Sequence, residues 1–330
     1  MKKSLLILLF TCWALFFAAF RPVMPFAAET AAFPDGTPVT GGRILMGTIG
    51  EPSNLIPYMA SDSASGEITG LLYVAPLKYD KDLNVVPWAA ASYEVLEGGR
   101  LLRFVLRDDI RWEDGVPLTA DDVEFTYKLM IDPKTPTAYS GDFLAIESFK
   151  KTGRLSFEVR YAKPFARSLM TWMGAILPKH VLEGQDIMTN PVARKPIGAG
   201  PYRLAKWDAG SMLTLTASDT YFEGRPNLDE VVYRIIPDPS TMFLELKAGK
   251  LDMMSLSPQQ YLRQTQGPQW ERDWRKYRYL SFSYTFLGFN LEHPFFKDVR
   301  VRRAISMAID RQSLIDGVLL GQGVPTVGPY

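Results

Sequence analysis

Cysteine and histidine are nearly absent from this chain, and their scarcity excludes several kinds of site. The 330 residues include one cysteine, Cys12, and two histidines, His180 and His293. Cys12 lies in an apolar run near the N-terminus, so removal of that run would leave a chain without cysteine. Such a chain has no disulfide, no thiolate metal site and no cysteine nucleophile. Two histidines so far apart in the sequence are also a weak basis for a metal site.

An excess of charge of either sign is absent too. The chain has 37 basic and 36 acidic residues, and its net charge is +1. Because basic and acidic residues are nearly equal in number, the composition shows neither the basic surface of a nucleic-acid-binding protein nor a polybasic membrane patch. Apolar residues make up 47% of the 330 residues, an ordinary share for a folded chain that is too long for one compact core. We therefore expect two or more domains and no nucleic-acid partner.

The signatures of common catalytic sites are also missing. The sequence contains no HExxH, no P-loop, no GxSxG and no glycine-rich dinucleotide fingerprint. The neighbouring acids Asp108-Asp109 and Asp121-Asp122 point apart on a helix or strand, so they are not expected to share acid–base work. His180, in Pro178-Lys179-His180, is interpreted as part of a helix start rather than as a catalytic base. We therefore predict that the chain is not an enzyme and has no cofactor.

The N-terminus is typical of a secretory signal peptide. Lys2 and Lys3 precede an apolar run over residues 5–20, and the small residues Ala27-Ala28 follow it. This order predicts a signal peptide over residues 1–28 and an exported, periplasmic protein. The run is slightly shorter than the ~20 residues of a membrane-spanning helix, and an uncleaved anchor is the alternative.

Cys12 and the segment that follows the predicted signal peptide are the other notable features of the N-terminal region. Cys12 is a poor candidate for lipid attachment, because Thr11 precedes it and the apolar run continues to Phe20. Residues 29–41 are rich in Ala, Pro, Gly and Thr and are expected to form a flexible lead-in.

The pattern of apolar residues predicts both strands and helices. Half-buried strands are expected near residues 43–48, 101–106, 155–161, 204, 212–216 and 231–236, with a long β-prone run at 279–289. Thr119 and Asp122, in capping-box spacing, predict a helix that ends at Asp132-Pro133. Other helices are expected after a loop at 61–70, at 240–248, from Asp298 to 308, and from Asp310 to before Gly321. This mixture fits an α/β or α+β architecture.

Four stretches together resemble the periplasmic peptide-binding family of ABC importers, solute-binding protein family 5. They are WEDGVPLTADDV at 112–123, PIGAGPY at 196–202, YFEGRPNLD at 221–229 with AGKLD at 248–252, and FN at 289–290 with PFFKDVRVRRA at 294–304 and AIDR at 308–311. Each stretch alone is only moderately specific. Their order and spacing together extend over nearly all of the chain after the apolar run.

The physical interpretations of these stretches are structural. Asp114-Gly115 suits a turn, because glycine tolerates positive φ. Gly198 and Gly200 allow backbone approaches that a side chain would block. The arginines that follow Asp298 are interpreted as the solvated face of a helix rather than as an anion site.

The resemblance implies a periplasmic-binding-protein fold, with two lobes joined by a hinge. Residues 42–74 and 191–276 would form the main domain of the first lobe, with residues 75–190 as a smaller inserted domain. Residues 277–330 would form a crossing strand and the start of the second lobe. Typical members of the family continue further, so we expect a C-terminally truncated second lobe and weak or absent peptide binding by this chain alone.

The resemblance also implies a function. The chain is expected to capture short peptides between two lobes and deliver them, as a monomer, to an ABC permease in the inner membrane. The same fold in related proteins binds nickel complexes, oligosaccharides, haem or opines, so these ligands remain alternatives. A ligand-presenting receptor for a membrane sensor is a further alternative.

Candidate ligand-binding residues come from the same resemblance. A bound peptide pairs its backbone with an exposed edge, and the family places such an edge in the loop Ser61, Asp62 and Ser63, which is otherwise an ordinary polar loop. Tyr139 occupies the position of a ligand-facing tyrosine, although a packed tyrosine is the alternative. Tyr284, Phe286 and Asn290 lie on or beside the predicted crossing strand, of which one face is expected to meet ligand. No residue is predicted to bind metal.

Overall fold

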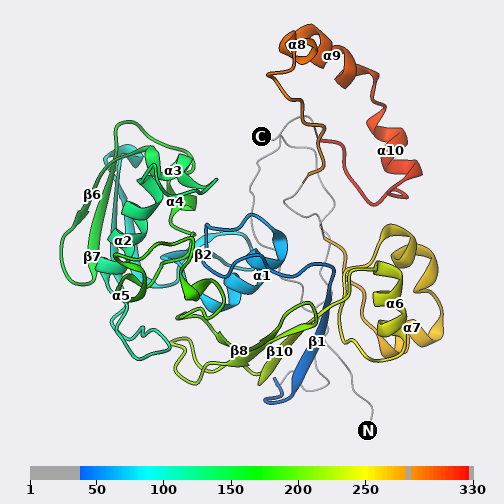
Figure 1. Cartoon of the computed structure of the whole chain (residues 1–330), viewed down its shortest axis with the longest axis horizontal. Helices are drawn as coiled ribbons and strands as arrows, with labels where there is room; N and C mark the ends of the chain where they lie inside the picture. Colours follow the sequence, from blue (N-terminus) through cyan, green and yellow to red (C-terminus); the bar gives the residue numbers. More distant parts are fainter. Residues whose placement is uncertain (1–37, 280–283, 327–330) are drawn as a thin grey trace. The chain divides into compact units, whose positions relative to one another are not determined.

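The computed structural model describes residues 38–279 and 284–326 (Figure 1). The predicted signal peptide, Cys12, most of the predicted lead-in and residues 280–283 of the predicted crossing strand lie outside the described residues. The chain divides into two compact units, one over Thr37–Met254 and one that includes Ser255–Tyr330. Each unit is described by itself below.

The first sheet of the Thr37–Met254 unit combines strands from distant parts of the sequence. Its order is β1-β10-β9-β8, with β1 parallel to β10 and the other neighbours antiparallel. The strands are β1 (Arg43–Thr48), β8 (Tyr202–Asp208), β9 (Met212–Ala217) and β10 (Glu230–Ile235). These positions confirm the predicted strands, because alternate residues such as Leu213 and Leu215 are buried as the pattern requires.

The outer edge of β1 is covered by the segment that leads away from this sheet. Gly47 N donates to Met253 O at 3.0 Å, and Asp252 N donates to Leu45 O at 2.8 Å. The helix α6 (Pro239–Lys247) precedes this segment and begins at Asp238, whose carboxylate accepts from Thr241 N. The helix predicted at 240–248 is therefore confirmed.

The second sheet has the order β4-β5-β7-β6 and lies entirely within residues 90–161. Its strands are β4 (Ala90–Leu96), β5 (Leu101–Leu106), β6 (Ile146–Lys151) and β7 (Ser156–Tyr161). One face carries a row of aromatic rings, in which Tyr93–Phe104, Phe104–Phe157 and Phe157–Phe149 have centroids 6.2, 4.8 and 5.2 Å apart. On these strands Arg103 pairs with both Glu94 and Glu158. A short hairpin of β2 (Leu77–Tyr79) and β3 (Val85–Pro87) precedes this sheet.

The predicted capping box is present at the start of α2 (Ala120–Ile131). Asp121 N donates to Thr119 Oγ1 at 3.3 Å, and Thr119 N donates to Asp122 Oδ2 at 2.8 Å. The two neighbouring acids do point apart, because Asp122 is buried whereas Asp121 pairs with Lys151. Burial raises the pKa of the Asp122 carboxyl, against hydrogen bonds from the backbone N–H groups of Thr119 and Lys179.

Short helices complete this unit. They are α3 (Ser140–Leu144), α4 (Ser168–Thr171) and α5 (Lys179–Leu182), with 3-10 turns η1 (Glu97–Gly99) and η2 (Pro191–Ala193). His180 lies at the start of α5, as predicted, and its Nε2 is 2.7 Å from Asp114 Oδ2. This contact joins α5 to the turn at 112–117, in which Gly115 has a φ of 87°.

The prediction of a loop at 61–70 was wrong, because most of that segment is helical. The helix α1 (Ser63–Leu72) begins directly after Asp62, whose side chain accepts a hydrogen bond from Ser65 N. An N-cap aspartate satisfies an otherwise unpaired N–H of the first turn, and Ile68 and Leu72 then bury one side of the helix. The small and polar residues at 61–67 are typical of a loop, so the sequence did not indicate that the helix begins at Ser63.

The unit that includes Ser255–Tyr330 is helical in its described part. It contains the π-helical turn η3 (Gln260–Gln264), α7 (Pro268–Asp273), α8 (Pro294–Lys297), α9 (Val299–Ala308) and α10 (Arg311–Gly317). Asp298 and Asp310 cap α9 and α10 by accepting from Arg300 N and Ser313 N. The helices predicted from Asp298 to 308 and from Asp310 to before Gly321 are therefore confirmed.

The predicted strand at 279–289 is not found in its described part. The stretches 255–279 and 284–326 contain no β-strand. A strand requires a paired neighbour for its backbone hydrogen bonds. β-prone side chains such as Tyr284 and Phe286 therefore do not form a strand, because the described residues of this unit supply no partner strand.

Candidate functional site

The polar loop before α1 is organised around Asp62. Asp62 Oδ1 accepts from Ser65 N at 2.7 Å, and Asp62 Oδ2 accepts from Ser53 Oγ at 2.5 Å and Ser65 Oγ at 2.8 Å. Ser65 Oγ in turn accepts from the backbone N–H groups of Ser53 and Asn54. The carboxylate therefore holds both ends of the loop 53–62 together.

These hydrogen bonds keep Asp62 ionised. Partial burial raises the pKa of the Asp62 carboxyl, but hydrogen bonds from Ser53 and Ser65 outweigh it and leave the pKa below the ordinary value. Since both oxygens already accept hydrogen bonds, the carboxylate acts first as a helix cap. Ser61 and Ser63 on either side of it are exposed.

Tyr58, in the same loop, has an unusual backbone conformation. Its φ is 72°, in the left-handed region that bulky residues rarely occupy. Its carbonyl oxygen accepts from Thr137 Oγ1 at 2.8 Å, and its hydroxyl donates to Ala175 O at 2.8 Å. Hydrogen bonds at both ends of the residue therefore hold a conformation that would otherwise be strained.

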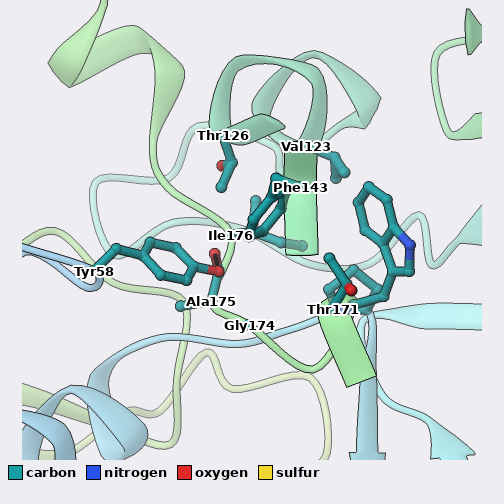
Figure 2. A pocket seen from close by; sticks show the side chains of 10 residues that line it. Tyr58, Val123, Thr126, Phe143, Thr171, Gly174, Ala175 and Ile176 are labelled. Carbon is teal, nitrogen blue, oxygen red and sulfur yellow. Dashed lines mark hydrogen bonds between the residues drawn. The ribbon is translucent and has the colours of Figure 1, made fainter. Parts of the chain in front are cut away.

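The hydroxyl of Tyr58 fits against a glycine. A Cβ atom at Gly174 would lie 2.2 Å from Tyr58 Oη, so only glycine leaves room for this contact. Figure 2 shows the Tyr58 side chain directed toward Ala175 and Gly174, beside a hollow lined also by Thr126 and Phe143. The hollow holds about 10 Å³ of free space, room for at most one water molecule. It is therefore not a ligand pocket, and burial there raises the pKa of the Tyr58 hydroxyl.

Tyr139 lies next to Tyr58 and is the more exposed of the pair. Its side chain is 46% exposed, and the two rings meet edge to face with centroids 6.1 Å apart. Its backbone N–H donates to Thr137 Oγ1 at 3.2 Å. An exposed tyrosine held in this way presents an apolar ring and a hydroxyl to a ligand.

The structure thus brings the predicted loop 61–63 and Tyr139 into one unit. Sequence reasoning missed Tyr58 and Thr137, which connect them. The left-handed φ of Tyr58 leaves no signal in the sequence, because it depends on contacts with residues 137 and 175.

The other three predicted residues lie in the second unit. Tyr284 and Phe286 are 46% and 73% exposed, with ring centroids 5.7 Å apart. Asn290 Oδ1 accepts from Glu292 N at 3.0 Å, and Asn290 O accepts from His293 N at 3.2 Å. Asn290 therefore shapes the turn before α8 in this structure. A ligand-binding role for all seven residues stays a prediction.

The glycine-rich stretch 196–202 packs against the end of α1. Gly200 N donates to Leu72 O at 2.8 Å. A Cβ atom at Gly198 would lie 1.9 Å from the same carbonyl oxygen. This contact confirms that the glycines permit a close backbone approach.

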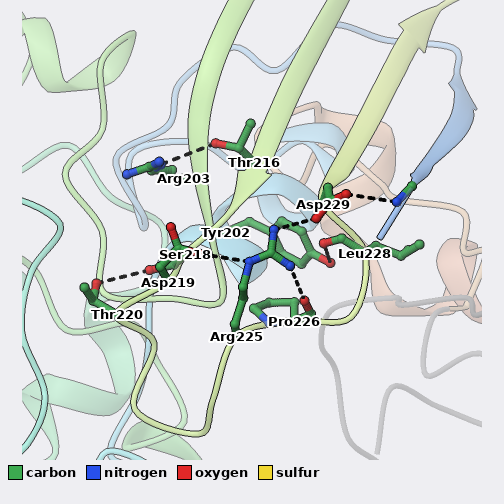
Figure 3. A network of polar contacts seen from close by, with 11 residues as sticks. Tyr202, Arg203, Thr216, Ser218, Asp219, Thr220, Arg225, Pro226, Leu228 and Asp229 are labelled. Atoms are coloured by element: carbon green, nitrogen blue, oxygen red, sulfur yellow. Dashed lines mark hydrogen bonds and ion pairs between the residues drawn. The ribbon is translucent and has the colours of Figure 1, made fainter. Parts of the chain in front are cut away.

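The stretch 221–229 forms a network of polar contacts within the first unit (Figure 3). Arg225 Nε donates to Asp219 Oδ1 at 2.8 Å, and Arg225 Nη2 donates to Asp229 Oδ1 at 2.5 Å. Asp229 Oδ2 accepts from Gly42 N at 3.0 Å, at the start of β1. The arginine therefore connects the loop to the first sheet rather than presenting a free charge.

A second cluster joins the same stretch to the β2–β3 hairpin. Glu223 Oε2 accepts from Tyr221 Oη at 2.6 Å and from Trp88 Nε1 at 3.2 Å. Lys78 Nζ lies 2.7 Å from Glu223 Oε1 and 5.4 Å from the centroid of the Trp88 ring. Lys78 and Trp88 are 145 and 135 positions away from Glu223 in the sequence, so this carboxylate connects distant segments of the chain.

Among the residues that the structure describes, no group of three or more His, Cys, Asp or Glu side chains is arranged to hold a metal ion. Within residues 38–279 and 284–326, no helix combines the length and apolar character that crossing a bilayer requires.

Comparison with known proteins identifies the family. Residues 84–330 match the family described as bacterial extracellular solute-binding proteins, family 5 Middle. The chain is 33% identical over 294 residues to the oligopeptide-binding protein AppA of Bacillus subtilis, covering 87% of this chain and 53% of AppA. It is 31% identical over 310 residues to protein XP55 of Streptomyces lividans, covering 92% of this chain and 55% of XP55. The chain thus spans about half the length of the curated relatives it matches.

Solved structures have the same fold. AppA from Bacillus subtilis in complex with a nonapeptide matches with a TM-score of 0.79 and 32% identity, over 88% of this chain and 58% of that one. NikZ from Campylobacter jejuni in complex with Ni(L-His) matches with a TM-score of 0.77 and 26% identity, over 87% of this chain and 57% of that one. The predicted mixed α/β class and the resemblance are therefore confirmed. The chain belongs to the family 5 bacterial extracellular solute-binding proteins.

Proposed function

We propose that this chain acts in the extracytoplasmic solute-binding component of an ABC importer, and that the ligand is a short peptide. The observation that carries this proposal is the match to AppA, an oligopeptide-binding protein, at 33% identity in sequence and a TM-score of 0.79 in structure. Export by the N-terminal segment to the periplasm, a monomeric state and delivery to an inner-membrane permease belong to the same proposal. So does the absence of enzymatic activity.

The proposed domain division follows the two sheets. Residues 42–74 and 191–276 would form one domain, which is supported by a sheet that pairs β1 with β10 across the intervening sequence. Residues 75–190 would form the inserted domain, which is supported by a sheet built only from residues 90–161. Residues 277–330 would begin the second lobe.

In this proposal the peptide is captured by closure of two lobes. The exposed residues Ser61 and Ser63, on either side of Asp62, would pair with the peptide backbone, and the Tyr139 ring would cover part of it. Tyr284, Phe286 and Asn290 would contribute from residues 277–330. Ligand binding would shift an open–closed equilibrium toward the closed form.

A chelated metal is the second candidate ligand. NikZ, solved with Ni(L-His), matches with a TM-score of 0.77. The first candidate is favoured by the higher identity to AppA, 32% against 26% among the solved structures. A ligand-presenting receptor role would use the same binding event and is separated from import by its membrane partner.

The test compares ligands directly. The chain is purified, as is a chimera in which residues 38–326 replace the matching part of AppA, so that the length of the relatives is restored. Thermal unfolding is measured with short peptides, with nickel–histidine and without ligand. Peptide is expected to raise the Tm of the chimera by mass action and to be recovered uncleaved. A rise with nickel–histidine alone, or cleaved peptide, would contradict the proposal.

A further inference from the structure

Tyr58 and Tyr139 are connected through a single hydroxyl group. Thr137 Oγ1 donates to Tyr58 O at 2.8 Å and accepts from Tyr139 N at 3.2 Å. The side chains of the two tyrosines also meet, with ring centroids 6.1 Å apart and an interplanar angle of 64°. Backbone and ring of Tyr139 are thus both held against Tyr58.

Tyr58 is itself held in place on its far side. Its hydroxyl donates to Ala175 O at 2.8 Å, and its ring meets Phe143 edge to face with centroids 6.0 Å apart. Gly174 leaves the space that the hydroxyl occupies. Because the free space beside it is only about 10 Å³, the side chain has little room to move.

The backbone at Tyr58 lies in the left-handed region. A non-glycine residue with a φ of 72° costs on the order of 1–3 kcal/mol, and such strain persists only where the surroundings impose it. The conformation places the Tyr58 carbonyl at Thr137 and the Tyr58 ring at Tyr139. Strain of this kind is concentrated at ligand sites.

We propose that Tyr58 is a positioning residue that fixes the exposed ring of Tyr139 for contact with an apolar side chain of the bound ligand. The inference rests on the proposed function for the ligand, but the positioning itself is a property of this unit. Tyr58 acts through Tyr139 and through the Thr137 hydroxyl. The edge-to-face pair leaves 46% of Tyr139 exposed to receive an apolar group.

The positioning is tested on the whole chain with 3-fluorotyrosine placed at position 139. Tyr58→Leu removes the ring contact, and Thr137→Val removes the shared hydroxyl at nearly constant shape. Both are expected to shift the ¹⁹F signal by more than its line width. Tyr127→Leu is the matched control, because Tyr127 is a half-buried tyrosine stacked on Phe149 with centroids 5.2 Å apart. The control should leave the signal in place.

A variant that never touches Tyr139 sharpens the test. In Gly174→Ala the new Cβ would lie 2.2 Å from Tyr58 Oη, so Tyr58 must move and the ¹⁹F signal should shift. Adding Tyr58→Phe removes the clashing oxygen and should return the signal part of the way. An unchanged signal in both Tyr58→Leu and Gly174→Ala variants that remain folded by circular dichroism would overturn the inference.

Peptide binding gives the second readout. In the AppA chimera, Tyr58→Leu is expected to reduce the preference for a phenylalanine-containing over an alanine-containing peptide by about 2- to 10-fold, the worth of one aromatic contact. Tyr127→Leu should leave the preference unchanged. Equal preference in wild type and Tyr58→Leu would overturn the ligand part of the inference. If the chimera binds no peptide at all, the proposed function fails, and the ¹⁹F signal still decides whether Tyr58 positions Tyr139.

Discussion

The carboxylate of Glu223 accepts a hydrogen bond from the indole Nε1 of Trp88 at 3.2 Å, across 135 positions of sequence. The same carboxylate binds Lys78 and Tyr221. Trp88 and Lys78 belong to the β2–β3 region, whereas Glu223 belongs to the loop before β10. One side chain therefore joins the segment proposed as the inserted domain to the segment that completes the first sheet.

Glu223→Gln is predicted to destabilise the first unit by about 1–2 kcal/mol, because it removes charge-assisted hydrogen bonds at a partly exposed site. Burial raises the pKa of Glu223, but bonds from Lys78, Tyr221 and Trp88 outweigh it and hold the pKa below the ordinary value. An acid with a lowered folded pKa stabilises the protein above its unfolded pKa and loses this contribution as the pH falls. The variant should therefore lose less stability than wild type between about pH 5 and pH 3.

Urea unfolding at several pH values measures this effect. Glu124→Gln serves as the control, since Glu124 forms an i,i+4 ion pair with the exposed Lys128 on α2. Such surface pairs contribute only about 0.3–0.5 kcal/mol. Equal losses in the two variants would show that the Glu223 cluster has no special role.

Gly198→Ala is predicted to destabilise the protein strongly, by about 3 kcal/mol or more. The new Cβ would lie 1.9 Å from Leu72 O, and backbone must move to relieve the overlap. Gly66→Ala is the matched control, because Gly66 lies inside α1 and a Cβ there meets nothing within 4 Å. That substitution should stabilise the helix by about 0.5–1 kcal/mol. Thermal unfolding of both variants gives the comparison, and a small loss for Gly198→Ala would contradict the close approach.

Local signals allowed much of the fold to be predicted from sequence. The capping box at Thr119 depends on residues four positions apart or fewer, and so do the caps at Asp298 and Asp310. The interpretation of Gly198 and Gly200 was also correct. A glycine lacks a Cβ atom, so its presence in the sequence indicates directly that another part of the backbone can approach closely.

Features that depend on distant contacts were not predictable. The early start of α1 depends on the Asp62 cap together with burial of Ile68 and Leu72. The β-prone run at 279–289 lacks a partner strand in its described part, and periodicity alone carries no information about partners. The candidate ligand residues came from resemblance to a family, so the structure supplies their surroundings, including Tyr58, rather than their role.

Asp62→Ala is predicted to affect both stability and peptide binding. Loss of the α1 cap should cost about 1–2 kcal/mol. The loss should be largest near neutral pH and disappear in acid, because the lowered pKa of Asp62 makes its contribution present above the ordinary value of 3.8 and absent at lower pH. The loop 53–62 would also lose the bond between Ser53 and Asp62.

Asp238→Ala is the matched control for Asp62→Ala. Asp238 caps α6 by accepting from Thr241 N at 2.7 Å, in the same way that Asp62 caps α1. Both variants should lose similar stability in urea unfolding. Only Asp62→Ala is expected to weaken peptide binding by the AppA chimera in calorimetry. Equal affinities would remove residues 61–63 from the proposed site.

The pKa of Glu113 is raised, whereas those of Glu223 and Asp62 are lowered, so its stability contribution changes with pH in the opposite direction. Burial raises the pKa of its carboxyl to about 7, with a contribution from Asp114 and against the influence of Arg203. An acid with a raised folded pKa favours the folded state while protonated, and this contribution is lost as the pH rises from the ordinary value of 4.5 through about 7. Glu113→Gln stays neutral at every pH and should therefore be more stable than wild type above pH 7 and similar to it near pH 4.

Because Glu113 is partly exposed, solvent reduces the gain in stability. Asp108→Asn, which removes the charge of an exposed acid in the same unit, is the control for the change in net charge, and both variants are compared with wild type by thermal unfolding. A constant difference between Glu113→Gln and wild type from pH 4 to pH 9 would contradict the raised pKa.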